Sequence, residues 1–336
     1  MSTPRPEPVA VIGAGSWGTA LAIQLARTGH ATMLWGRDGA HLKAMGQARC
    51  NASYLPDAPF PEPLVTEPDL RAALSRCDDV LITVPSHAFR ATLMLIRPHL
   101  REASRIAWAS KGFEAASGLL PHQVAREVLG KRPMAVLSGP TFAREVGKGL
   151  PTAMAIASSD VAIADDFAQR LAGPNFRVYT LTDIAGVEVG GADKNVIAIG
   201  CGIADGMGFG ANTRVALITR GLAEMMRLGL SMGGQRETFM GLAGLGDLVL
   251  TCTDDQSRNR RVGLAIGRGE NYLAAEQNIH QVVEGVPAAR AVYAVAAKAG
   301  VDMPICAEVY RVMYESKPIR EAVAALMGRD QRAEAD

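Results

Sequence analysis

The 336-residue sequence has few cysteines, few histidines and almost no net charge. The five cysteines are scattered and contain no C-x-x-C pair, which argues against a disulfide framework and against a thiolate zinc site. The six histidines contain no H-x-x-x-H pair, so we expect no metal. A net charge of +1 gives no general attraction to nucleic acid or to an anionic membrane, and we expect no nucleic-acid partner.

The sequence also lacks long apolar runs. No run reaches the ~18–20 apolar residues that a membrane span needs, and residues 1–8 are polar and rich in proline, unlike a signal peptide. We therefore expect a cytoplasmic protein with no membrane span, with frayed first residues and a disordered tail at residues 329–336. A length of 336 residues and a hydrophobic fraction of 48% predict about two well-buried domains.

A glycine-rich segment near the N-terminus organises the first half. Gly13, Gly15 and Gly18 follow four apolar residues and precede a run rich in alanine and leucine, which predicts a strand, a tight turn and a helix. Gly13 suits the turn, Gly15 lets the backbone approach a pyrophosphate, and Gly18 lets the helix pack on the strand. Free N–H groups at the helix N-terminus would bind the phosphates. The segment predicts a dinucleotide site, with a purely structural turn as the alternative.

The residues after the second predicted strand, residues 31–35, bear on which dinucleotide binds. In this fold an acid at that position binds the ribose 2′-hydroxyl, whereas a nearby arginine accommodates a 2′-phosphate. Arg37 comes first and Asp38 follows. We therefore expect NADPH to be preferred, with NADH possible. A solvated loop cation is the alternative role for Arg37.

The remaining patterns predict the two halves of the molecule. Residues 51–68, rich in proline and polar side chains, predict an irregular segment. From about residue 185 the strand patterns stop and helical runs follow one another. We expect an α/β fold with a Rossmann-type doubly wound sheet in residues 1–185, then an all-helical domain in residues 186–328. Five more apolar runs predict strands, at residues 79–84, 105–110, 134–137, 152–158 and 176–180.

Several polar residues follow these strands directly. Because ligands of open α/β sheets bind beyond the carboxyl ends of the strands, residues 85–86, Lys111 and residues 138–143 should line one cleft. In the helical half, Lys194 and Asn195 lie in a small and apolar helical run that would carry them into the interior. A surface lysine that snorkels to solvent is the alternative.

A second polar cluster lies further along the helical half. Ser257 and Asn259 stand among three arginines, Arg258, Arg260 and Arg261. Arginine gives bidentate contacts to phosphate oxygens, and serine and asparagine add neutral hydrogen bonds. The cluster therefore predicts an anion site. An exposed basic turn would have the same composition.

At this point the chain resembles the bacterial NAD(P)-dependent glycerol-3-phosphate dehydrogenase family, from about residue 9 to residue 327. The resemblance implies a Rossmann domain followed by a helical domain of the 6-phosphogluconate dehydrogenase type. It also implies reversible hydride transfer between NAD(P)H and dihydroxyacetone phosphate, giving sn-glycerol 3-phosphate for glycerophospholipid synthesis. The segments that carry it are residues 13–20 (GAGSWGTA), 137–143 (LSGPTFA), 194–196 (KNV), 244–247 (GLGD) and 251–260 (TCTDDQSRNR).

The resemblance also implies the site residues. Lys194 would be the acid/base, oriented by Asn195 and Asp247, and Thr251 could assist one helical turn beyond Asp247. Asp193 departs from the apolar residue usual in the family, and we expect it to point away from Lys194. The implied substrate contacts are Lys111, Gly139, Thr141, Lys194, Asp247, Ser257, Arg258 and Asn259. The predicted dinucleotide contacts are Gly13, Gly15, Ser16, Trp17, Gly18, Arg37, Lys111, Ala143, Arg258, Val282 and Glu284.

A lysine suits the implied reaction, because a pKa of ~10.4 keeps it protonated and ready to reduce a ketone at neutral pH. Burial or a nearby cation would lower that pKa. Two alternatives stay open. A 3-hydroxyacid dehydrogenase of the same superfamily would need a carboxylate pocket in place of residues 257–259, and a non-catalytic dinucleotide sensor would need only the glycine turn. We expect a homodimer that acts on a small phosphorylated substrate.

Overall fold

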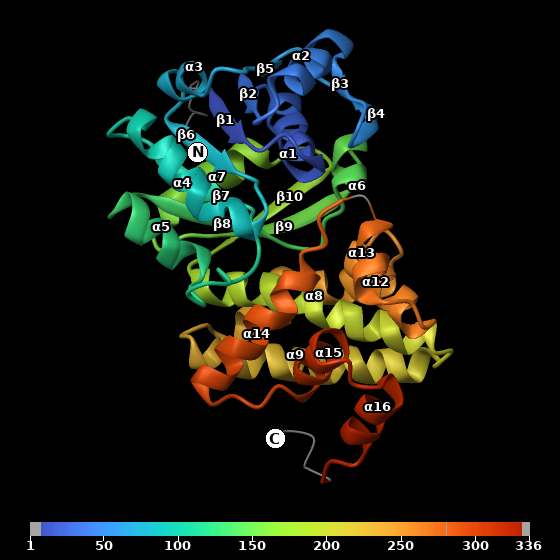
Figure 1. Ribbon diagram of the computed structural model, residues 1–336. Helices are drawn as coiled ribbons and strands as arrows, with labels where there is room; N and C mark the ends of the chain where they lie inside the picture. Colours follow the sequence, from blue (N-terminus) through green and yellow to red (C-terminus); the bar gives the residue numbers. More distant parts are fainter. Residues whose placement is uncertain (1–7, 280, 331–336) are drawn as a thin grey trace.

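The computed structural model describes residues 8–279 and 281–330. The predicted tails, residues 1–8 and 329–336, lie outside the described residues except for residues 8, 329 and 330, and Arg329 forms an ion pair with Asp302. The molecule has an α/β half built on one eight-stranded sheet and a helical half beside it, with α8 (Ile184–Gly206) at the boundary (Figure 1). The predicted fold class, a Rossmann-type sheet followed by helices, is confirmed.

The main sheet has the strand order β10-β9-β8-β7-β6-β1-β2-β5. Six neighbouring strands of this sheet, β8-β7-β6-β1-β2-β5, run parallel to one another. This is the arrangement of dinucleotide-binding sheets. Strand β9 runs antiparallel to β8, and β10 runs parallel to β9. The strands are β1 (Val9–Ile12), β2 (Thr32–Trp35), β5 (Leu64–Thr66), β6 (Asp79–Ile82), β7 (Arg105–Trp108), β8 (Met134–Ser138), β9 (Thr152–Ala157) and β10 (Phe176–Leu181).

Helices cover both faces of this sheet (Figure 1). Successive strand residues face opposite sides, so Val9 and Val11 join one apolar cluster, whereas Ala10 and Ile12 join the other. Both faces are therefore buried, as a parallel sheet requires. The helices of this half are α1 (Ser16–Arg27), α2 (Gly39–Ala48), α3 (Leu70–Ser75), α4 (Phe89–Ile96), α5 (Pro121–Leu129), α6 (Ala143–Lys148) and α7 (Val161–Leu171), with 3-10 turns η1 (Ser86–Ala88) and η2 (Arg97–His99).

Residues 51–68 contain no helix, as expected, but they are not irregular throughout: the prediction missed the strands in this segment. Strands β3 (Cys50–Asn51) and β4 (Leu55–Pro59) pair as a short antiparallel ribbon, and β5 extends the main sheet beside β2. Proline lacks the N–H of a central strand but is tolerated in edge strands. Since β4 and β5 both have a free edge, the prolines that suggested irregular chain do not prevent pairing.

The helical half packs around α8. This helix is mainly apolar and is buried along most of its length, as expected of a helix in the middle of a domain. A Cβ on Gly202 would lie 2.2 Å from the carbonyl oxygen of Arg260, so α8 and α12 pack backbone against backbone. The other elements are α9 (Ala211–Ser231), α10 (Arg236–Met240), the π-helical turn η3 (Leu242–Gly246), α11 (Asp247–Thr253), α12 (Arg258–Gly267), α13 (Tyr272–Gln277), α14 (Gly285–Ala299), α15 (Pro304–Tyr314) and α16 (Ile319–Met327).

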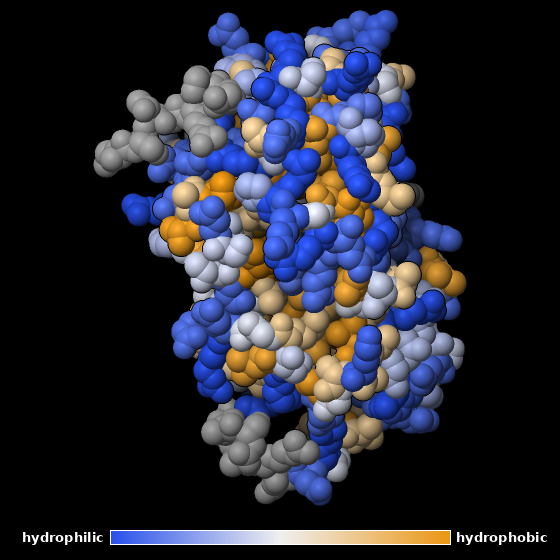
Figure 2. Space-filling model, turned by 90° about the vertical axis from the view of Figure 1, so that its left-hand side faces the viewer, coloured by the Kyte–Doolittle hydropathy of each residue, from blue (hydrophilic) through white to orange (hydrophobic). Residues whose placement is uncertain are grey.

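The two halves share apolar contacts. Phe113 and Leu120 of the first half join the main cluster of the helical half, and Val187 and Ala243 join a cluster beneath the sheet. Polar side chains predominate on the face shown in Figure 2, with apolar side chains between them. No helix within residues 8–279 and 281–330 is long and apolar enough to span a membrane. The division at residues 185/186 stays a prediction.

Candidate active site

The glycine turn has the geometry that a dinucleotide needs. Gly13 has φ +122°, which favours glycine, and a Cβ on Gly18 would lie 1.9 Å from the carbonyl oxygen of Gly13. A Cβ on Gly15, by contrast, would meet no atom within 4 Å. The N–H groups of Ser16 and Trp17 begin α1 beside that open space. An exposed backbone at a helix N-terminus fits a pyrophosphate.

Arg37 and Asp38, which follow β2 closely, differ in what they contact. The Asp38 carboxylate accepts a hydrogen bond from the His41 N–H at 3.0 Å and caps α2. Arg37 is exposed and has no hydrogen bond or ion pair to any residue that the structure describes. One oxygen of the Asp38 carboxylate is thus already used by a hydrogen bond within the protein, whereas the Arg37 guanidinium is available to a ligand.

Three charged side chains from three elements meet at the centre of the molecule. Lys194 on α8 donates to Asp247 Oδ1 and, at 3.1 Å, to Thr251 Oγ1. Lys111, which follows β7, donates to Asp247 Oδ2 at 2.6 Å. Lys194 is 8% exposed and Asp247 1% exposed. A single carboxylate therefore joins the two lysines across the boundary between the halves.

The surroundings change the ionisation of this group. Burial lowers the pKa of Lys194 to about 7, and Lys111 acts in the same direction, while Asp247 opposes both. Burial alone would raise the pKa of Asp247, but Lys111 and Lys194 hold it below its usual value. Asp247 is therefore ionised at neutral pH. Lys194 exchanges a proton in the same range, which suits a general acid/base.

Local structure fixes Asp247 in this position. The π-helical turn η3 precedes it and packs closely on α8, because a Cβ on Gly190 would lie 2.6 Å from the carbonyl oxygen of Ala243. Such turns occur frequently at functional sites. Thr251 lies one turn further along α11 and donates to the Asp247 carbonyl oxygen at 2.6 Å.

A chain of amide hydrogen bonds lies beside Lys194. Asn259 Nδ2 donates to Asn195 Oδ1 at 2.8 Å, and the Gly285 N–H donates to Asn259 Oδ1 at 2.9 Å. Asn195 Nδ2 in turn donates to the Gly191 carbonyl oxygen at 3.3 Å. Both amides are thus held in fixed orientations. Asn259 retains one amide hydrogen for a ligand.

The residues of the predicted anion cluster, residues 257–261, have different partners in the structure and do not form one group. Arg258 donates to the Val282 carbonyl oxygen at 2.5 Å, and Ser257 caps α12 by accepting from the Arg260 N–H at 3.2 Å. Arg260 is buried and forms an ion pair with Asp205 at 2.8 Å. Arg261 is exposed. The grouping of three arginines is therefore wrong: Arg260 is committed to a carboxylate of α8, and only Arg258 lies with the predicted cofactor contacts.

Arg258 also lies near a contact between the two halves. Ser86 Oγ, at the predicted cleft after β6, donates to Glu284 Oε2 at 3.0 Å. Burial raises the pKa of Glu284, while Ser86 and Arg258 oppose the shift. Three predicted cofactor contacts, Arg258, Val282 and Glu284, are thus brought together opposite the α/β half.

The segment after β8 lies against the same centre. Gly139 has φ +145°, Thr141 donates to its carbonyl oxygen at 3.3 Å, and Ala143 begins α6. The Ser138 hydroxyl is buried and has no partner among the described residues. It lies 3.5 Å from the position of a Cβ on Gly191, as do carbons of Lys111 at 3.4 Å. Ser138 was predicted only as part of the cleft, and its free hydroxyl adds a candidate contact.

Asp193 is not among the charges that act on Lys194, in line with the expectation that it points away from that lysine. It is fully buried, and neither carboxylate oxygen has a hydrogen-bond partner within the described part of the chain. Burial raises its pKa well above the usual value, and the neighbouring charge that adds to the shift is Glu224. The charges that act on Lys194 are those of Asp247 and Lys111.

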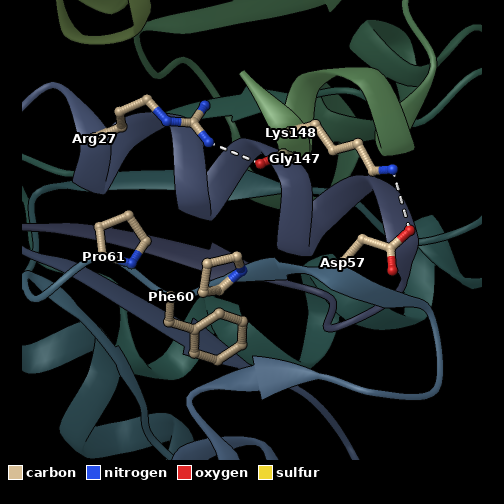
Figure 3. A pocket seen from close by; sticks show the side chains of 7 residues that line it. Arg27, Asp57, Phe60, Pro61, Gly147 and Lys148 are labelled. Carbon is tan, nitrogen blue, oxygen red and sulfur yellow. Dashed lines mark hydrogen bonds and ion pairs between the residues drawn. The ribbon is translucent and has the colours of Figure 1, made fainter. Parts of the chain in front are cut away.

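Two hollows lie outside this centre. One, shown in Figure 3, lies at the C-terminal end of α1 and is lined by Arg27, Lys148, Asp57 and neighbouring residues. Its cations are already used, since Arg27 donates to the Gly147 carbonyl oxygen at 2.7 Å and Lys148 pairs with Asp57 at 3.2 Å. The other, of about 410 Å³, is a mainly apolar space between α8, α9, α15 and α16. Neither contains a predicted site residue.

No three His, Cys, Asp or Glu side chains of residues 8–279 and 281–330 lie close enough together to hold a metal ion. All five cysteines are free thiols.

Comparison with known proteins gives long matches. Models of the N-terminus and C-terminus of NAD-dependent glycerol-3-phosphate dehydrogenase match residues 8–164 and 183–324. An NAD(P)+-linked glycerol-3-phosphate dehydrogenase of Sodalis glossinidius is 57% identical over 326 residues, covering 96% of each chain. One from Yersinia pestis is 56% identical over 332 residues, covering 98% of each. The crystal structure of glycerol-3-phosphate dehydrogenase from Coxiella burnetii has a TM-score of 0.93 and 47% identity, covering 96% of this chain and 99% of that chain.

Proposed function

Since the chain belongs to the NAD-dependent glycerol-3-phosphate dehydrogenase family, we propose that its reaction takes place at Lys194, with NADPH as the preferred cofactor. The chain is an NAD(P)-dependent oxidoreductase, and its family interconverts dihydroxyacetone phosphate and sn-glycerol 3-phosphate. One observation carries the assignment of the site. Lys194 and Asp247, both buried, form a hydrogen-bonded group with half-buried Lys111 where the two halves meet.

Lys194 holds the proton that the reaction needs. When bound, NAD(P)H supplies the hydride for the carbonyl carbon, and the glycine turn with the open space at Gly15 fits its pyrophosphate. The Lys194 ammonium then stabilises the developing oxygen charge and donates its proton to that oxygen. Asp247 and Thr251 fix the direction of the ammonium. In the reverse direction, neutral Lys194 accepts the proton of the substrate hydroxyl.

The lowered pKa of Lys194 predicts opposite pH profiles for the two directions. Reduction needs the ammonium, so we expect kcat/KM for dihydroxyacetone phosphate to fall about tenfold per unit as the pH rises above about 7. Oxidation needs the neutral amine, so kcat/KM for glycerol 3-phosphate should fall about tenfold per unit as the pH drops below about 7. Steady-state assays between about pH 5 and 9 cover both declining limbs, the one for oxidation below pH 7 and the one for reduction above it. Profiles that change in the same direction would exclude Lys194 as the shared proton carrier.

We assign the substrate phosphate to Arg258 and Asn259, assisted by Lys111. Arg258 is oriented by the Val282 carbonyl oxygen, and Asn259 keeps a free amide hydrogen. Lys111 lies on the other half, so both halves would contact the substrate. The other proposed substrate contacts are Gly139, Thr141 and Ser257, and the other cofactor contacts are Ser16, Trp17, Ala143 and Glu284.

Exposed Arg37 supports a preference for NADPH. We expect Arg37→Ala to raise KM for NADPH about tenfold and to change KM for NADH less than about twofold, because a charged hydrogen bond to the 2′-phosphate contributes ~1.5–3 kcal/mol. Parallel assays with both cofactors test this, with Arg320→Ala on α16 as a distant control. An equal loss with the two cofactors would remove Arg37 from 2′-phosphate recognition.

We further propose that the protein is a cytoplasmic homodimer that supplies glycerol 3-phosphate for glycerophospholipid synthesis. A steady-state assay with dihydroxyacetone phosphate, run with NADH and NADPH in parallel, tests the proposed function. We expect turnover with both cofactors and a higher kcat/KM with NADPH. Faster turnover of a 3-hydroxyacid would favour the first alternative considered from the sequence. Tight NADPH binding without turnover would favour a dinucleotide sensor.

A further inference from the structure

A buried carboxylate outside the proposed active site connects the two halves. Glu188, on the second turn of α8, is 3% exposed. Its Oε1 accepts from the Trp108 indole N–H at 3.0 Å and from the His122 backbone N–H at 2.9 Å. Its Oε2 lies 2.5 Å from His122 Nδ1. One side chain of the helical half is therefore bonded to β7 and to the first turn of α5 in the other half.

The two elements that Glu188 joins each carry one of the paired lysines. Trp108 ends β7, and Lys111 follows it by three residues; Lys194 follows Glu188 by six residues on α8. Six helical residues correspond to a rise of about 9 Å on one rigid element. The Glu188–Trp108 bond therefore lies close in the chain to both lysines that bind Asp247: three residues before Lys111 and six residues before Lys194.

The side chain of Lys111 packs so closely on α8 that the helix and the lysine cannot move independently. A Cβ on Gly191 would lie 3.4 Å from two side-chain carbons of Lys111, so the stem of this lysine lies directly on α8. A shift of α8 along β7 would move the Lys111 ammonium relative to Asp247, which it now meets at 2.6 Å. Hydrogen bonds are directional and resist such a shift, whereas apolar contacts permit it.

We propose that Glu188 is a positioning residue, which holds α8 in register with β7 and thereby sets the spacing of Lys111 and Lys194 across Asp247. It lies outside the proposed substrate and cofactor contacts and acts through Trp108 and His122. The inference rests on the proposed function, because the proposed function is what assigns Lys111 and Lys194 to the reaction. The two oxygens of Glu188 contact three groups of the other half at once: the Trp108 indole N–H, the His122 backbone N–H and His122 Nδ1.

The test compares four variants by kcat, by KM for both substrates and by the pH profile of reduction. Glu188→Ala should lower kcat about 10- to 100-fold with little change in KM for NADPH, since misplacement by about 1 Å can cost that much. The charges that act on Lys194 are Asp247 and Lys111. Loss of the Lys111 contact should therefore move the pH profile up by about one unit. Glu188→Gln keeps one acceptor oxygen and should restore most of kcat.

Trp108→Phe removes only the indole donor and should give a smaller loss with the same upward shift. The matched control is Glu224→Ala, because Glu224 is equally buried but accepts from the Ile305 and Cys306 N–H groups within the helical half. It should lower thermal stability without moving the pH profile. If Glu188→Ala lost stability as Glu224→Ala does but kept the wild-type kcat and profile, Glu188 would be structural only. Should Glu188→Ala not fold, Glu188→Gln and Trp108→Phe decide the question by the same readouts.

A readout without catalysis separates this proposal from the proposed function. In a crystal structure of Trp108→Phe, we expect Lys111 Nζ to lie beyond hydrogen-bond distance of Asp247. An unchanged contact would overturn the positioning role. Absence of turnover in the wild-type protein would instead overturn the proposed function and would leave the structural comparison valid.

Discussion

Replacing Lys194 by alanine is expected to lower turnover of dihydroxyacetone phosphate by about 10³-fold or more. The variant loses the proton donor, whose contribution is typically ~10²–10⁴-fold, and also the charge that stabilises the developing oxyanion. Binding of NADPH should change little, because the glycine turn and Arg37 lie on the other half. Steady-state kinetics and a fluorescence titration with NADPH measure the two quantities separately.

The matched control for this variant is Lys298→Ala, which removes an exposed lysine from α14. It should keep wild-type kinetics. If Lys194→Ala retained more than a tenth of the wild-type activity, Lys194 would not be the acid. If NADPH binding were lost to the same extent as turnover, the variant would report on folding of the site instead of proton transfer.

Replacing Arg258 by alanine is expected to raise KM for dihydroxyacetone phosphate about 100-fold. The guanidinium is held by the Val282 carbonyl oxygen, and a hydrogen bond between charged groups contributes up to ~3 kcal/mol. The loss should fall on substrates that carry a phosphate. Dihydroxyacetone, which lacks it, should be turned over about as poorly by the variant as by the wild type.

Arg261→Ala provides the control on the same helix, because Arg261 is exposed one turn further along α12. Its KM should stay within about twofold of wild type, as usual for an exposed arginine without a phosphate contact. Equal losses on dihydroxyacetone and on its phosphate in Arg258→Ala would show that Arg258 does not bind the phosphate. A loss confined to NADPH would assign Arg258 to the cofactor alone.

The sequence predicted those parts of the fold in which local pattern and tertiary environment agree. The six strands predicted after β1 all form, with ends within two residues of those expected. The strands within residues 51–68 were missed because proline composition does not reveal that β4 lies in a two-stranded ribbon and β5 at the edge of the main sheet. The reversed direction of β9 likewise depends on the connection through α6, which composition does not encode.

The candidate site was predictable where a polar residue interrupts an apolar run. Lys194 and Asn195 are buried as that argument expects. The ion-pair and hydrogen-bond partners that decide a charged residue's role could not be predicted from such local patterns. Arg260 is paired with Asp205, which lies 55 positions away, and nothing local distinguishes it from Arg258. Glu188 was missed for the same reason, since Trp108 and His122 become its neighbours only when the two halves pack.

A crystal structure of the complex with NADPH and glycerol 3-phosphate tests the central claim most directly. The account predicts that Lys194 Nζ lies within about 3.2 Å of the substrate C2 oxygen while remaining bonded to Asp247, with the phosphate against Arg258. A structure in which another group contacts the C2 oxygen, and in which Lys194 lies out of reach of it, would contradict the account.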